Sequence, residues 1–202
     1  FDSGEALRWF CDRVLDTTPK RGLELASAVP TGEEYELFLE GNRGPFFDQN
    51  IGGSLLGLEY DRSLSTEDVH GRLARGLTTG IVLTEWMYIS LIEEHFGTTI
   101  ESVRVLNDDA PTTEESYDWW NTQRSSIWDL PIVEMEPRTI AGLLIPAALI
   151  SSKYKSPTEA KERLLRRQSV IEPEPDITEQ YTQRREGYAD RWRELATLYG
   201  HE

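Results

Sequence analysis

The sequence predicts an α/β fold in which a mixed sheet is flanked by helices. Short apolar runs that are typical of buried strands alternate with longer segments whose apolar residues recur at helical spacing. The chain has 202 residues, and a domain of this length buries roughly 70% of the surface that its unfolded form exposes. Because no internal repeat or low-complexity tract divides it, we expect residues 1–202 to form one domain.

The first part of the chain predicts a helix, a strand and a glycine-rich loop. Residues 4–15 have helical apolar spacing, and Ser3 is suited to cap this helix. A short apolar run at residues 37–39 predicts a strand, which leads into the glycine-rich turn of residues 41–45. We expect residues 46–58 to form a loop with a short strand, because this segment contains further glycines.

A long helix is predicted to begin after Ser65. Asp68 lies three residues on, where its side chain can complete a capping box. Apolar residues then recur at helical spacing until Gly97, which is a stop signal. Gly76 and Gly80 lie one turn apart on this helix, so we expect another element to approach that face closely.

The second half of the chain alternates strands with helices. In order, we expect a strand at 103–106, a helix at 116–128, a strand at 132–135, a helix at 139–151, a helix from Pro157, and a helix from Asp176 that ends before Gly200. The helix at 139–151 is almost entirely apolar, so we expect it to be buried and to be bent or shortened by Pro146. Glu179 is expected to be the capping partner at the start of the last helix.

The charge of the chain argues against two classes of partner. Lys and Arg number 21 and Asp and Glu number 36, which gives a net charge of −15 at pH 7. Proteins bind nucleic acid by replacing counterions with Lys and Arg, so we expect neither nucleic acid nor an anionic membrane surface as a partner. No apolar run reaches the ~18 residues of a membrane span.

The cysteine and histidine content predicts no disulfide and no metal site. Cys11 is the single cysteine, so no intrachain disulfide can form, and this favours an intracellular, cytoplasmic location. His70, His95 and His201 lie far apart in sequence and show no metal-ligand spacing. We interpret each histidine as a surface or helix-end residue.

Five short motifs, in order and with matching spacing, resemble the C-terminal domain of the FGGY carbohydrate kinases, relatives of glycerol kinase and xylulokinase. They are Gly4-x-x-x-Arg8-Trp9 for G-x-x-x-[QR]-W, residues 41–58 for G-x-R-x-P-x-x-D-x-x-x-x-G-x-x-x-G-L, residues 75–80 for R-A-x-x-E-G, Trp120 to Pro131 for W-x(10)-P, and Glu174-Pro175-Asp176 with Tyr181, Tyr188 and Trp192 for the aromatic ending. An insertion precedes the third motif. Each motif alone is also explained by structure, with the glycines in turns and Trp9, Trp120, Tyr188 and Trp192 as core aromatics.

The resemblance implies an actin-like ATPase (ribonuclease H-like) fold and transfer of the γ-phosphate of ATP, with Mg²⁺, to a sugar or polyol hydroxyl. It also implies that the sugar site, the catalytic Asp and the phosphate loops belong to a half that precedes Phe1. The chain would then be a C-terminal nucleotide-binding domain without its first strands, and not a complete enzyme. We therefore expect no catalytic residue in it and a substrate bound through the other half, with a homodimer left open.

The resemblance assigns nucleotide contacts to Gly4, Arg8 and the loop of Asn107, Asp108 and Asp109. A glycine lets the backbone approach the ligand, and Arg8 can donate to ribose or phosphate, although a solvated helix residue is an equal alternative. The family has a run of glycines where this chain has the acidic loop. Asn and Asp tolerate the left-handed backbone, but one like-charged pair at ~5 Å and an effective dielectric of ~20 costs about 3 kcal/mol.

Further departures leave the use of nucleotide open. Ser125 and Ser126 stand where the family has Ala-Asp, Asp129 stands where it has Gly, and residues 111–115 form an extra loop. Either the nucleotide binds in a modified way, or the chain is a kinase-derived binding or regulatory module that has lost ATP. A third hypothesis is one subunit of a split kinase.

Overall fold

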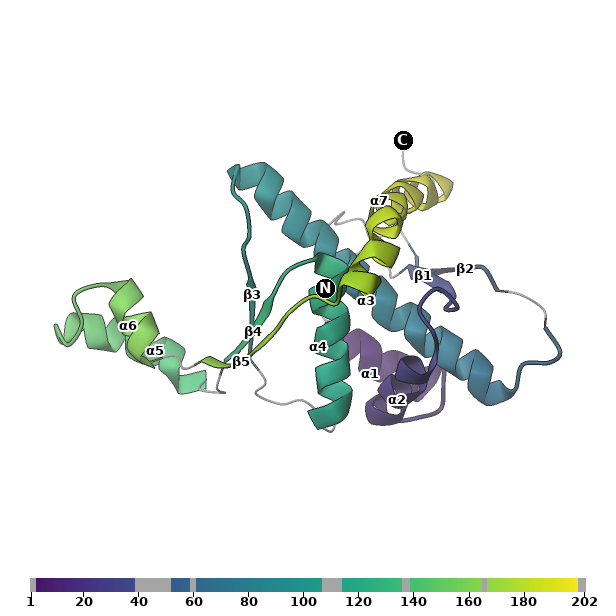
Figure 1. Cartoon of the computed structure of the whole chain (residues 1–202), viewed down its shortest axis with the longest axis horizontal. Coiled ribbons are helices and arrows are strands. Elements are labelled where there is room, and N and C mark those ends of the chain that lie inside the picture. Colours follow the sequence, from purple (N-terminus) through teal and green to yellow (C-terminus); the bar gives the residue numbers. More distant parts are fainter. Residues whose placement is uncertain are drawn as a thin grey trace.

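The structure is a computed structural model that describes residues 3–38, 52–58, 61–106, 114–135, 139–164 and 167–199. Its elements follow in the order shown in Figure 1: α1 (Ser3–Arg13), α2 (Pro19–Ala28), β1 (Glu36–Phe38), β2 (Ser54–Leu56), α3 (Thr66–Phe96), β3 (Val103–Leu106), α4 (Glu114–Trp128), β4 (Ile132–Met135), α5 (Thr139–Ile150), α6 (Pro157–Leu164), β5 (Arg167–Ile171) and α7 (Pro175–Leu198). The predicted α/β class is confirmed.

The larger sheet is mixed, with the strand order β3-β4-β5. β3 and β4 are parallel and pair Val103 with Ile132, whereas β4 and β5 are antiparallel and pair Ile132 with Ile171. A register shift interrupts the second pairing between Glu134 and Met135. β1 and β2 form a separate antiparallel pair. Strands were predicted in both of their segments, whereas β5 was not expected from the sequence.

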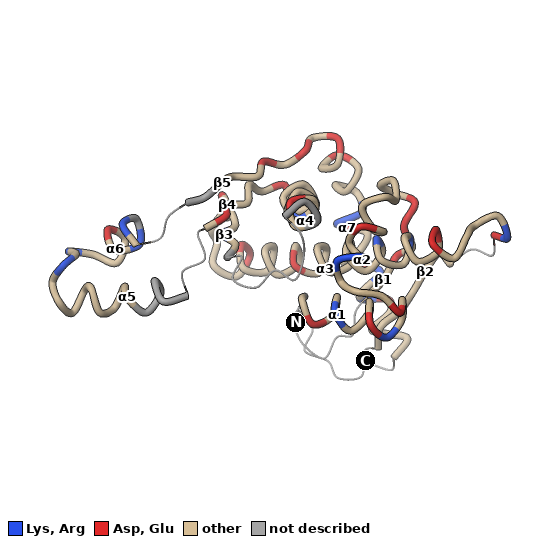
Figure 2. Tube along the Cα trace, turned by 90° about the horizontal axis from the view of Figure 1, so that it is seen from below, with Lys and Arg blue, Asp and Glu red and all other residues tan. Residues whose placement is uncertain are grey.

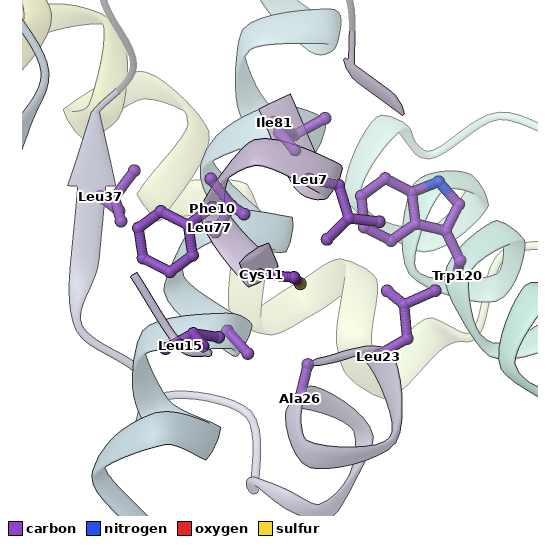
Figure 3. Packing of buried hydrophobic residues seen from close by; sticks show 11 residues of the cluster. Leu7, Phe10, Cys11, Leu15, Leu23, Ala26, Leu37, Leu77, Ile81 and Trp120 are labelled. Atoms are coloured by element: carbon purple, nitrogen blue, oxygen red, sulfur yellow. The ribbon is translucent and has the colours of Figure 1, made fainter. Parts of the chain in front are cut away.

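α3 is the central helix of the molecule and begins and ends as the sequence predicts. Ser65 is its N-cap, and Ser65 and Asp68 form a complete capping box. Gly97 ends the helix in the left-handed conformation at φ 59. One buried hydrophobic cluster joins α3 to α1, α2, β1 and Trp120 of α4. Figure 3 shows its members Leu7, Phe10, Cys11, Leu15, Leu23, Ala26, Leu37, Leu77, Ile81 and Trp120. A second cluster joins α3 to α4, β4 and α7.

Gly76 and Gly80 admit the chain of residues 35–37 onto the surface of α3. A Cβ atom on Gly76 would lie closer than 3.0 Å to the carbonyl oxygen of Tyr35, and a Cβ atom on Gly80 would lie closer than 3.0 Å to the carbonyl oxygen of Leu37. The predicted close approach is therefore confirmed, and β1 is the element that makes it.

α7 lies across the second cluster and buries the aromatic residues of the last motif. Tyr181 and Tyr188 are 0% exposed and Trp192 is 1% exposed. The rings of Phe38 and Tyr188 stack with their centroids 4.6 Å apart. The interpretation of these residues and of Trp120 as core aromatics is confirmed, whereas Trp9 is 58% exposed and that part of the interpretation was wrong.

Two helix predictions need correction. α5 forms and continues through Pro146, but it is not buried, because Ile150 is 86% exposed and Leu144 is 46% exposed. α7 begins one residue before the predicted start, and its N-cap residue Glu174 makes no side-chain capping bond, so the expected capping box with Glu179 does not form. α2 was not expected, although Thr18 caps it and Pro19 opens it. Among the described residues, no helix is long and apolar enough to cross a membrane.

Candidate nucleotide-binding surface

β3 and β4 direct their carboxyl ends to the same edge of the larger sheet, because the two strands are parallel. In open α/β sheets, ligands bind beyond the carboxyl ends of the strands. Leu106 is the last described residue of β3, and the acidic loop follows it. Asn107, Asp108 and Asp109 lie outside the described residues, so their assignment as nucleotide contacts stays a prediction.

Gly4 and Arg8 lie one turn apart on the exposed face of α1. The opposite face of this helix packs into the first cluster through Leu7 and Phe10. Arg8 Nη1 donates to Glu5 Oε2 at 2.9 Å, and the two side chains are 60% and 64% exposed. The ion pair leaves other N–H groups of the Arg8 guanidinium facing solvent, so the side chain is free to bind a ligand or to stay solvated.

Cys11 is not available as a nucleophile or a metal ligand. Its side chain is 0% exposed and lies against Gly22, where a Cβ atom would overlap the Cys11 sulfur. Burial raises the pKa of the thiol to about 11. A thiol that stays protonated reacts slowly, because the thiolate is the reactive form.

The residues that depart from the family pattern at the end of α4 have structural roles. The Ser126 hydroxyl accepts a hydrogen bond from the backbone N–H of Glu174 at 2.9 Å and so caps α7 from another helix. Ser125 Oγ donates to the carbonyl oxygen of Leu130 at 2.8 Å. Asp129 adopts a left-handed backbone at φ 58, where a glycine is the usual choice. A cap that comes from 48 residues away leaves no local signal in the sequence.

Arg75, the first residue of the third motif, is a buried cation that contacts several elements. It is 2% exposed, and its Nη2 donates to Thr31 Oγ1 at 3.0 Å and to Gln123 Oε1 at 2.8 Å. Its guanidinium also lies 5.0 Å from the centre of the Trp119 ring. Arg75 therefore joins α3 to α4, and this motif is a packing motif.

A buried ion pair fastens α7 to the segment before β1. Glu34 pairs with Arg184 and also accepts hydrogen bonds from the Tyr181 hydroxyl at 2.8 Å and the Gly32 N–H at 2.7 Å. Burial alone would raise the pKa of Glu34, but Arg184 and these hydrogen bonds outweigh it and lower the pKa. Burial raises the pKa of Tyr181, and the neighbouring Glu34 charge adds to that shift. No periodic signal marks this pair in the sequence, because its members lie 150 residues apart.

Among the described residues, no group of three or more His, Cys, Asp or Glu side chains is placed to hold a metal ion. The chain matches no family model. It also matches no curated protein.

Solved structures, in contrast, match the chain over nearly its whole length. They include a ligand-bound xylulose kinase from Lactobacillus acidophilus (22% identity, TM-score 0.76) and a gluconate kinase from the same organism (22% identity, TM-score 0.77), each over 98% of this chain. A Plasmodium falciparum glycerol kinase solved with ADP matches over 99% of it (14% identity, TM-score 0.72). The chain shares the fold of part of these kinases. It spans 39% of the length of the first two and 37% of the third.

Proposed function

We propose that this chain is the nucleotide-binding part of an ATP-dependent kinase that phosphorylates a sugar or polyol hydroxyl. The observation that carries the proposal is the shared fold with xylulose, gluconate and glycerol kinases over 98–99% of the chain. Because the chain spans only 37–39% of those kinases, we assign the catalytic base and the sugar site to other parts of the natural protein.

The exposed side of β3 supports the proposal that further strands complete this domain. Within the described residues, β3 pairs with β4 alone and forms one edge of the sheet. Val103 and Val105 are only half-buried, and Arg104 is exposed. Parallel strands are normally covered on both faces, and open edges are normally protected. A strand from elsewhere in the protein, paired along β3, would satisfy both requirements.

Arg8 is the described side chain that best fits a nucleotide. Its guanidinium is largely exposed and retains donors beyond the one that binds Glu5, and a planar guanidinium suits phosphate and ribose oxygens. Gly4, one turn earlier on the same face, has no side chain that would occupy the space beside Arg8. When bound with Mg²⁺, the nucleotide would supply the phosphoryl group for transfer. The contribution of this chain would be to bind and orient it.

The first experiment is calorimetric titration of Mg-ADP into the full-length natural protein. We expect micromolar binding that Arg8→Ala weakens about 10- to 100-fold, because hydrogen bonds to charged groups contribute about 1.5–3 kcal/mol. Arg13→Ala is the matched control, since Arg13 is an exposed, ion-paired arginine at the other end of α1. If both variants lose affinity equally, the loss is not specific to the predicted contact.

The acidic loop is tested by the double variant Asp108→Gly/Asp109→Gly. Removing two carboxylates near the phosphates of the nucleotide is expected to tighten Mg-ADP binding, by up to about a hundredfold if one pair costs about 3 kcal/mol. Binding by the glycine variant alone would mean that this loop has abolished nucleotide use in an otherwise intact site. If neither protein binds nucleotide and the natural protein turns over no ketose or polyol with ATP, the proposed function is wrong.

A further inference from the structure

α5 combines an uncharged sequence with an exposed position. None of its twelve residues, TIAGLLIPAALI, carries a charge. Leu144 is nevertheless 46% exposed and Ile150 is 86% exposed. A helix that is apolar on all sides is normally buried, because transfer of its side chains out of water is favourable. The exposed side of α5 therefore needs a covering surface.

The immediate neighbours of α5 do not supply that surface. α5 packs on α6, and the two helices project together from the rest of the domain in both views (Figures 1 and 2). We call residues 139–164 the arm. The α6 helix contacts α5 but leaves Leu144 and Ile150 exposed to solvent.

The charge around α5 is opposite to that of the rest of the chain. Four cationic side chains are exposed on the arm: Lys153, Lys155, Lys161 and Arg163. The arm contains four Lys or Arg and two Asp or Glu, whereas the rest of the chain contains 17 and 34. A partner with an apolar centre and acidic side chains around it would match this surface.

We propose that the exposed side of α5 is the docking surface for a polypeptide segment of the same natural protein that lies outside residues 1–202, apolar where it meets Leu144 and Ile150 and acidic around them. The proposal rests on the proposed function for the source of that segment, because the matched kinases extend well beyond the 39% that this chain spans. A covalently attached surface also acts at an effective concentration of about millimolar, which favours it over a separate molecule.

Two other occupants share part of this chemistry. A second copy of the chain offers an acidic surface but lacks the advantage of covalent attachment. An anionic bilayer would accept an apolar helix with basic neighbours, but it repels a chain of net charge −15 within a Debye length of about 8 Å. Each alternative therefore becomes an outcome of the test.

The test is cysteine accessibility in the full-length natural protein. Single Leu144→Cys and Ile150→Cys variants are labelled with a maleimide at low micromolar protein, and rates are read at each site by peptide mass mapping. Cys11 gives little background, since it is 0% exposed and its thiol has a raised pKa. Leu198→Cys is the control, because Leu198 is 80% exposed on α7. We expect the two cysteines introduced on α5 to label at least 10-fold more slowly than the control, and equal rates would overturn the proposal.

The conditions of labelling separate the occupants. Protection that appears only as protein concentration rises would assign the surface to a second copy, and protection only with phosphatidylserine vesicles would assign it to lipid; either result overturns the proposal. Adding Lys161→Glu and Arg163→Glu to Ile150→Cys should speed labelling several-fold, and an unchanged rate would contradict the acidic surroundings. No nucleotide is present in this test. The docking proposal can therefore fail while the kinase proposal stands, and the kinase proposal can fail while the docking proposal stands.

Discussion

α5 and α7 show that the charge content of a helix does not decide its burial. α7 carries many charged residues, yet it buries Tyr181, Tyr188 and Trp192 almost completely. α5 carries none, yet it leaves Ile150 86% exposed. The difference lies in the partners. α7 meets a surface of the described chain that matches its shape and charge, whereas the main neighbour of α5 within the described residues is the short helix α6.

The surface on which α7 packs depends on one glycine of α3 and on two glutamates near β1. Gly80 brings the backbone of Leu37 onto α3, and this backbone carries Phe38 to the ring of Tyr188. Arg184 and Arg191 of α7 pair with Glu34 and Glu36, which lie in the segment that leads to Phe38. These two ion pairs therefore join α7 to the same segment that its buried aromatic residues contact.

The largest expected difference between the two regions comes from one substitution made in each. Ile81 is 0% exposed in α3, and Ile81→Ala in the 202-residue chain should lower the free energy of unfolding by about 2–5 kcal/mol through lost burial and a cavity. Ile150→Ala should change it by no more than about 0.5 kcal/mol, because the side chain is already in water. Urea unfolding followed by circular dichroism measures both. A large loss for Ile150→Ala would show that α5 is already covered within this chain.

The second difference concerns glycines inside the two long helices. Gly80→Ala should destabilise the protein by about 1–3 kcal/mol, because the new Cβ meets the backbone of Leu37, which cannot yield without moving β1. Gly187→Ala is the comparison in α7, where the Cβ meets the guanidinium of Arg191, which is the end of a side chain and can shift at the cost of weakening its pair with Glu36. It should cost less than Gly80→Ala, because helix propensity favours Ala by up to about 1 kcal/mol and offsets the weakened pair. Thermal unfolding of the two variants decides, and equal behaviour would contradict the close approach.

The third prediction concerns the ion pair of Glu34 with Arg184, which holds α7 to the segment before β1. At pH 7, Glu34→Gln should cost about 1–3 kcal/mol, since it removes a charged partner of Arg184 and keeps the shape of the side chain. The pKa of Glu34 is lowered in the folded state, so its contribution is present above the unfolded pKa of about 4.3 and is lost as pH falls through the folded value. The gap between parent and variant should therefore shrink below about pH 4. A gap that stays constant from about pH 7 to about pH 3 would exclude the ion pair as its cause.

Local sequence signals predicted the elements whose boundaries are set locally. Ser65, Asp68 and Gly97 fix the ends of α3 through bonds within four residues, and the structure has them as predicted. The start of α7 was predicted to within one residue, but its cap could not be predicted in the same way, because Ser126 caps it from a different helix. The exposure of α5 was missed for a related reason. An apolar helix indicates that its surface must be covered, but it does not indicate that the covering segment belongs to residues 1–202.

The candidate site was predictable only in part. A motif proposed Gly4 and Arg8 as nucleotide contacts; the structure places both on the exposed face of α1, and their role stays a prediction. The buried pair of Glu34 with Arg184 and the role of Arg75 were not found, because each depends on residues more than 40 positions apart. Such contacts become visible only when the helices are packed.

The smallest expected effect concerns exposed surface charge, which has opposite net signs on the domain body and on the arm. Glu186 is exposed in the middle of α7, four residues from Asp190, so Glu186→Gln removes a like-charge repulsion and should stabilise by a few tenths of a kcal/mol in low salt. Lys161→Gln on the arm removes a cation from a chain of net charge −15 and should be neutral or slightly destabilising. Both effects should vanish in about 1 M KCl, where the Debye length is about 3 Å, while the parent itself becomes more stable as its excess negative charge is screened. Thermal melts of the three proteins between about 0.05 and 1 M KCl measure this. If salt fails to stabilise the parent, the net charge is already neutralised locally, and the contrast between an acidic body and a basic arm has no energetic consequence.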